Sequence, residues 1–160
     1  MLFRSTAEQL ASAVEDLTGF RWTYENFDQL SNDDYGYRVL SGGVDGYAVG
    51  KAQSEPGITW ALVVKRLAQA AGDNVVATEL EADGDRRLFT EVTLDDRPGD
   101  DAFTAELKQL HWRMFGRRAT DERLAADEAL WTEVEAADGA AAAWATLVSA
   151  LLRDPEFVGY

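Results

Sequence analysis

Hydrophobic residues recur at steps of three and four along much of this chain, which is the spacing of one buried face of an α-helix. The pattern is clearest where Phe103, Leu107, Leu110 and Met114 follow one another. The stretches that carry it are 5–19, 54–80, 100–116, 120–138 and 140–153. We therefore predict an all-α fold in which about five helices pack as an irregular bundle.

Residues that start and stop helices support these boundaries. Ser5-Thr6-Ala7-Glu8 has the pattern of a capping box at the first helix, and Gly19 offers a stop for it. Asp100 or Asp101 is expected to cap the third helix. Asp154 is followed by proline, and a residue before proline avoids helical geometry, so the last helix should end there.

The second helix leaves two alternatives open. Its predicted buried stripe includes Ile58, Leu62 and Leu67. It either continues to Leu80 or is interrupted at Gly72-Asp73-Asn74, because glycine and asparagine weaken a helix.

Two other stretches lack a helical period. Residues 20–54 form a long loop rich in aromatic residues and glycine, with a possible short β piece predicted at Tyr37-Arg38-Val39-Leu40. A short extended piece is predicted where Leu88, Phe89, Val92 and Leu94 follow the second helix. Because no linker or repeat divides the sequence, we predict one helical domain over residues 1–160.

The net charge of the chain limits which classes of partner it is expected to bind. The chain has 29 acidic and 15 basic residues and a formal net charge of -14. Such a surface repels phosphate backbones, so we predict no nucleic-acid binding and interpret the charge mainly as a source of solubility. No apolar stretch is long enough to insert in a membrane, and Met1-Leu2-Phe3-Arg4 lacks the apolar core of a signal peptide.

The stretch 35–47 is the candidate binding site. Its glycines allow backbone conformations closed to other residues, although glycines mark structural turns more often than ligand contacts. It matches neither a phosphate-binding loop nor a dinucleotide fingerprint. If it binds a ligand, Tyr37 would stack on it, Arg38 would hold an anionic group and Asp45 would supply a carboxylate.

The catalytic and metal candidates are weaker. His111 is the single histidine, and it flanks the apolar face of its predicted helix, so we interpret it as a packed side chain. Arg117 and Arg118 follow that helix, where cations favour the helix dipole. The acid pairs do not match a calcium loop, and cysteine is absent. We predict no catalytic residues, no metal and no cofactor.

Several short motifs resemble helical domains of unknown function from planctomycete and myxobacterial proteins, which accompany cytochrome-c-like domains. The motifs are Val14-Glu15-Asp16-Leu17-Thr18-Gly19, Tyr35-Gly36-Tyr37-Arg38, Leu110-His111-Trp112-Arg113-Met114-Phe115-Gly116-Arg117-Arg118, Ala129-Leu130-Trp131, Ala143-Trp144-Ala145 and Ser149-Ala150-Leu151-Leu152-Arg153-Asp154-Pro155-Glu156-Phe157. The resemblance implies a module at the C-terminal end of a larger, exported protein, without an established activity. Unlike those proteins, this chain has no haem-attachment motif.

These observations favour a non-catalytic helical interaction or structural module within or beside a larger envelope-associated bacterial protein. Its partner would be another protein or a neighbouring domain. The alternative is a ligand-binding domain of an enzyme or electron-transfer system, with its site near residues 35–47. That alternative predicts a pocket that brings Arg38, Asp45 or His111 together. The interaction hypothesis predicts an exposed apolar patch flanked by acids.

Overall fold

The computed structural model describes residues 6–31, 37–41, 57–82 and 84–159. The helices are α1 (Ala7–Thr18), α2 (Ile58–Val76), α3 (Asp101–Phe115), α4 (Asp121–Asp138), α5 (Ala140–Leu152) and α6 (Pro155–Val158). A π-helical turn, η1 (Ala77–Glu81), extends α2, and β1 (Thr23–Tyr24) pairs with β2 (Phe27–Asp28) in an antiparallel hairpin. The predicted mainly α-helical bundle is therefore confirmed.

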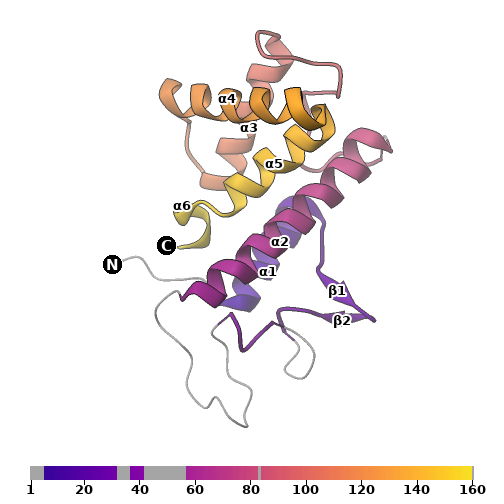
Figure 1. The fold of residues 1–160 in the computed structure, drawn as a ribbon, viewed down its shortest axis with the longest axis vertical. Helices are drawn as coiled ribbons and strands as arrows, with labels where there is room; N and C mark the ends of the chain where they lie inside the picture. The colour runs from indigo at the N-terminus through magenta and orange to yellow at the C-terminus, as the bar shows by residue number, and fades with distance from the viewer. Residues whose placement is uncertain (1–5, 32–36, 42–56, 83, 160) are drawn as a thin grey trace.

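The long helix α2 and the apolar helix α5 lie side by side at the centre of the bundle (Figure 1). In the described residues, α1 packs on α2, and α4 packs on α5. The short α6 contacts both α3 and α5. The interior of the bundle contains a cluster of four buried aromatic rings, whose contacting pairs have centroid separations of 5.0–5.7 Å. The cluster consists of Phe89, Phe103, Trp131 and Trp144.

The first helix is capped one residue later than the sequence pattern suggested. Thr6 is the N-cap: its hydroxyl accepts the N–H of Gln9, while the Gln9 side chain accepts the N–H of Thr6. Glutamine at this position closes a capping box as glutamate would. Gly19 ends the helix with φ 70°, in the left-handed region that favours glycine.

Helix α2 runs unbroken through Gly72-Asp73-Asn74, so of the two alternatives the continuous helix is correct. A Cβ atom on Gly72 would lie 2.5 Å from the backbone oxygen of Ala145 in α5. Glycine is therefore required at this position by the close approach of two helices, and it does not mark a helix end.

The buried face of α2 differs from the predicted stripe at its start. Ile58 and Leu62 are 84% and 55% exposed, so their assignment to the core was wrong. Trp60 and Val64 are buried in their place, whereas Val63 and Leu67 are buried as predicted.

Two buried carboxylates hold the irregular segment 84–100. Glu79 accepts the N–H groups of Leu88 and Phe89 at 2.8–3.0 Å. Glu106 accepts those of Thr90, Glu91 and Val92 at 2.8–3.3 Å through one oxygen. These donors bind side chains, and the segment forms bends and turns in place of the short extended piece predicted for it. Leu88, Phe89 and Val92 are buried, and Leu94 is partly buried.

The predicted β piece at residues 37–40 was wrong, because residues 37–41 form a turn. Ser41 donates its N–H to the carbonyl of Tyr37 at 2.8 Å and its hydroxyl to the same oxygen at 2.7 Å. The short hairpin lies earlier, where Glu25 and Asn26 adopt positive φ and reverse the chain.

Replacing Gly72 with alanine tests the contact between α2 and α5. Overpacking should outweigh the gain in helix propensity and lower the free energy of unfolding by about 1–3 kcal/mol in a urea titration. The exposed Asn74 is the matched control, and Asn74→Ala should be neutral or stabilising by a few tenths, roughly, of a kcal/mol. Equal stability of the two variants would contradict the close approach.

Replacing Glu106 with alanine tests its role as an acceptor. Three backbone donors lose their partner, so the free energy of unfolding should fall by about 2–4 kcal/mol. The exposed Glu91 provides a control, with an expected change within about 0.5 kcal/mol for Glu91→Ala. A similarly small change in Glu106→Ala would rule out this role.

Candidate functional site

The residues proposed from the sequence as ligand contacts are found in structural interactions. Tyr37 stacks on Trp22 with ring centroids 4.9 Å apart and planes 12° apart. The Arg38 guanidinium lies 3.2 Å from the carboxylate of Glu8, an ion pair that joins this turn to α1. Asp45 lies outside the described residues. Ligand binding by these three residues therefore stays a prediction.

His111 is buried, with 4% of its surface exposed, and its Nε2 lies 2.5 Å from Oδ2 of Asp127 on α4. The interpretation of His111 as a packed side chain is confirmed. Asp127 was not recognised from the sequence, although it lies three residues after Leu124 and four before Trp131. An acid within the apolar stripe of α4 was the signal that marked a buried partner.

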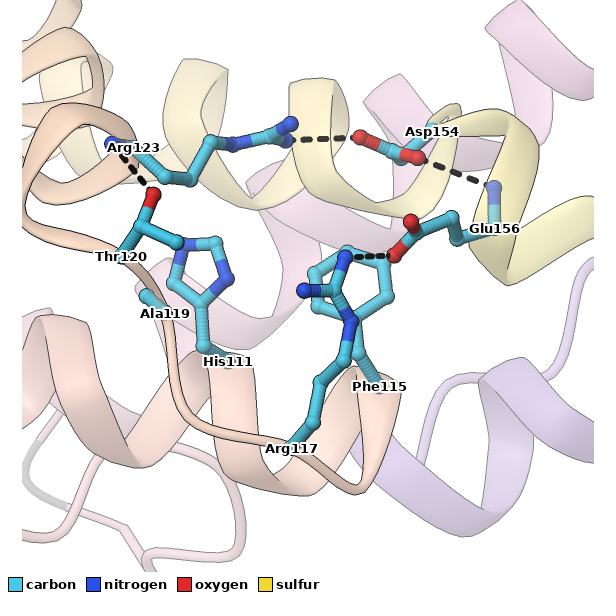
Figure 2. Close-up of a pocket in the computed structure, with 8 residues that line it drawn as sticks. All are labelled: His111, Phe115, Arg117, Ala119, Thr120, Arg123, Asp154 and Glu156. Atoms are coloured by element: carbon cyan, nitrogen blue, oxygen red, sulfur yellow. Dashed lines mark hydrogen bonds and ion pairs between the residues drawn. The ribbon is translucent and has the colours of Figure 1, made fainter.

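Further ion pairs connect this pair to α6 (Figure 2). Arg123 donates to Asp154 at 2.7 Å, and its Nε lies 3.5 Å from the second oxygen of Asp127. Arg117 pairs with Glu156, so the cation that the sequence placed at the end of α3 reaches across to α6. Ion pairs thus hold the C-terminal helix to α4 and to the residues that follow α3.

These residues surround a cavity of about 270 Å³ between the end of α3, the start of α4 and α6 (Figure 2). We call it the His111 cavity. Its lining residues are His111, Phe115, Arg117, Ala119, Thr120, Arg123, Asp154 and Glu156. Arg38 does not line it, so the structure does not bring Arg38 and His111 together in this cavity.

The charges around the cavity stabilise one another. Burial disfavours the charge on Asp154, but the Glu156 N–H and Arg123 more than compensate and lower the pKa of its carboxyl. The hydrogen bond from Arg117 to Glu156 raises the pKa of that guanidinium. Thr120 Oγ accepts the N–H of Arg123, as the N-cap of α4. The arrangement provides charge and hydrogen-bond donors but no activated nucleophile.

A second concavity shares Ala119, in the connector 116–120 between α3 and α4, with the His111 cavity. We call it the Trp112 groove; its volume is about 490 Å³. It is lined by Ala105, Lys108, Gln109, Trp112, Arg118, Ala119, Asp121 and Leu124. Trp112 is 58% exposed, whereas Trp60, Trp131 and Trp144 are buried. An exposed tryptophan beside a groove is a feature of binding surfaces.

The groove also lies in the most basic part of an acidic chain. Positions 108–123 hold five of the 15 basic residues but only two of the 29 acids. Lys108 and Arg118 line the groove, with Asp121 as its one acid. The rim is therefore mainly cationic, which differs from the acidic flank expected for an interaction surface.

None of the helices in the described residues combines the length and apolar composition needed to cross a bilayer. Within those same residues, no group of three or more metal-ligating His, Cys, Asp or Glu side chains gathers. Comparisons with protein-family models, curated proteins and solved structures find no match. The resemblance to planctomycete and myxobacterial domains stays a prediction.

Asp154→Asn tests the ion pair between α4 and α6. Because asparagine can still cap α6, the variant removes the charge alone and should cost about 1 kcal/mol at neutral pH. The pKa of Asp154 is lowered below 3.8 in the folded state. The stabilisation is therefore present above that value and should disappear as the pH falls through the folded pKa.

The measurement is urea unfolding of both proteins across an acidic pH series. The exposed Asp85 gives the control, with Asp85→Asn expected within about 0.5 kcal/mol of wild type throughout. A difference for Asp154→Asn that does not shrink in acid would show that the charge of Asp154 is not its cause.

Proposed function

We propose that this chain is a non-catalytic helical interaction module that binds a partner protein through the Trp112 groove. The observation that carries the proposal is the exposure of Trp112 beside two cations, on a helix whose opposite face is buried. Tryptophan and arginine dominate the energetics of many protein interfaces. Because α3 is anchored by Leu107, Leu110 and Met114, the groove is presented by a rigid element.

The charges of the groove define the chemistry of the partner. We infer a segment that presents an aliphatic or aromatic side chain to Trp112 and a neighbouring carboxylate to Lys108 and Arg118. A strongly acidic partner would be repelled by the net charge of -14. We therefore infer that the partner carries its carboxylate within the docking segment and is not strongly acidic as a whole.

The geometry around His111 supports a non-catalytic role. One nitrogen of His111 is occupied by Asp127, and both arginines of the His111 cavity are held by carboxylates. A nucleophile beside a general base would favour an enzyme, and the lining residues of this cavity do not supply that pair.

The alternative, a ligand-binding domain with its site near residues 35–47, is favoured by one observation. Trp22, which stacks on Tyr37, lines a concavity of about 470 Å³ with Leu62, Lys65, Arg66 and Gln69. We prefer the Trp112 groove because Trp22 already covers Tyr37 and Glu8 already pairs with Arg38. Membership of a larger envelope-associated protein rests on the sequence resemblance alone.

A random peptide library tests the docking surface. The full chain is immobilised and panned, and enriched peptides are synthesised with a fluorescent label for anisotropy titrations. We expect peptides that combine an apolar residue with Asp or Glu, and an affinity loss of about tenfold or more in Trp112→Ala. A double charge reversal, Lys108→Glu with Arg118→Glu, should weaken the same peptides.

The matched control is Leu62→Ala, which removes an apolar side chain of similar exposure from another helix. It should leave the affinities unchanged. Enriched peptides that bind Trp112→Ala as tightly as wild type, or that bind both charge states of the rim equally, would refute the proposal. So would a library that yields no enrichment.

A further inference from the structure

Glu106 of α3 is a buried carboxyl group with one oxygen that the packing leaves without a partner. None of its surface is exposed, and none of the ion pairs among the described residues includes it. Oε2 accepts the N–H groups of Thr90, Glu91 and Val92, whereas Oε1 is buried and has no hydrogen-bond partner. The other buried glutamate, Glu79, accepts N–H groups through both of its oxygens. The role of Glu106 as a backbone acceptor therefore accounts for only half of its carboxyl group.

The free oxygen allows Glu106 to bind a proton and still hold the backbone. A carboxyl group that is protonated on Oε1 continues to offer Oε2 as an acceptor to the three N–H groups. Burial of a charge without a cation also costs far more than burial of a neutral polar group. The geometry of the site therefore suits the neutral form of Glu106.

The charged groups around Glu106 supply no cation to its carboxyl group. They are Arg86, Glu91 and Arg97 of the segment 84–100, Glu79 of η1, His111 and Arg113 of α3, and Asp127 and Glu135 of α4. Of the three arginines, two donate to backbone carbonyls of the segment, and Arg97 pairs with a glutamate of α4. His111 pairs with Asp127, and α5 contains no charged residue. Burial raises the pKa of Glu106 above its ordinary value of 4.5, the three N–H groups oppose this only in part, and the charge of Glu91 adds to it.

We propose that Glu106 is a pH-dependent switch: its neutral carboxyl group holds residues 90–92 against α3, and its ionisation releases them from this contact. In the released segment the carboxyl group is hydrated and regains its ordinary pKa. Because the pKa of Glu106 is raised in the folded state, its stabilisation is present below the ordinary value of 4.5 and is lost as the pH rises through the folded-state value. This direction is opposite to that of the Asp154 ion pair, whose stabilisation is lost in acid.

The titration of Glu106 itself is the first test, and it requires no variant. The side-chain carboxyl carbon of Glu106 is followed by NMR in the full chain across a pH series. We expect a midpoint above 4.5, because burial disfavours the charge. A midpoint at or below that value would overturn the proposal.

Native-state hydrogen exchange measures the release of the segment. Protection factors of the Thr90, Glu91 and Val92 amides are followed across the same pH series, after correction for the base-catalysed intrinsic rate. They should fall as the pH rises through the Glu106 midpoint, by about tenfold for each unit that separates the folded pKa from the ordinary one. The amides of α5 should keep their protection, because the bundle stays folded. A constant protection of the segment, or an equal fall along α5, would contradict a local switch.

Two matched variants assign the effect to one carboxyl group. Glu106→Gln keeps an acceptor for the three N–H groups but cannot ionise, so their protection should stay constant over the pH range in which wild type loses it. Glu91→Gln makes the same change at an exposed carboxyl group of the segment and should keep the fall, with a slightly lower midpoint. A wild-type fall in Glu106→Gln, or the loss of the fall in Glu91→Gln, would assign the pH dependence to another group and overturn the proposal.

Discussion

The close approach of α2 and α5 at Gly72 and Ala145 is the constraint on which the rest of the structure depends. It brings together the two helices with the most buried residues, and α5 then carries Trp144 into the aromatic cluster. The direction of α5 also places α6 beside α3, where Glu156 pairs with Arg117 of the connector and the N-cap residue Asp154 pairs with Arg123 of α4. Both candidate sites therefore depend on helices that this contact positions.

Buried carboxylates serve as acceptors where regular backbone pairing stops. Glu79 and Glu106 together accept five N–H groups of the segment 88–92. Burial raises the pKa of Glu106, and its three N–H donors oppose that shift only in part. Asp127 fills a comparable role between two helices, where it orients His111. Some acidic residues of this strongly acidic chain thus act as hydrogen-bond acceptors in its interior.

The spacing of hydrophobic residues predicted the helices well, because each helix buries one face and the residues of that face recur every three or four positions in the sequence. The prediction that Ile58 and Leu62 are buried failed because an apolar residue at the start of a helix need not face a neighbouring element. The sequence did not distinguish Glu106 from other acidic residues in helices, because the N–H groups that it accepts belong to a segment about fifteen residues away in the chain. The contact of His111 with Asp127 is equally non-local, although an acid between Leu124 and Trp131 was a usable sign.

The connector 116–120 forms part of the wall of both concavities, with Ala119 shared between them. Arg117 lines one concavity and Arg118 the other. Any occupant that shifts this short segment changes the shape and field of both concavities. Thermodynamic linkage requires such an influence to be mutual: whatever factor one ligand imposes on the affinity of the other, it receives in return. Neighbouring arginines of one backbone stretch thereby provide a physical basis for coupling between the two concavities.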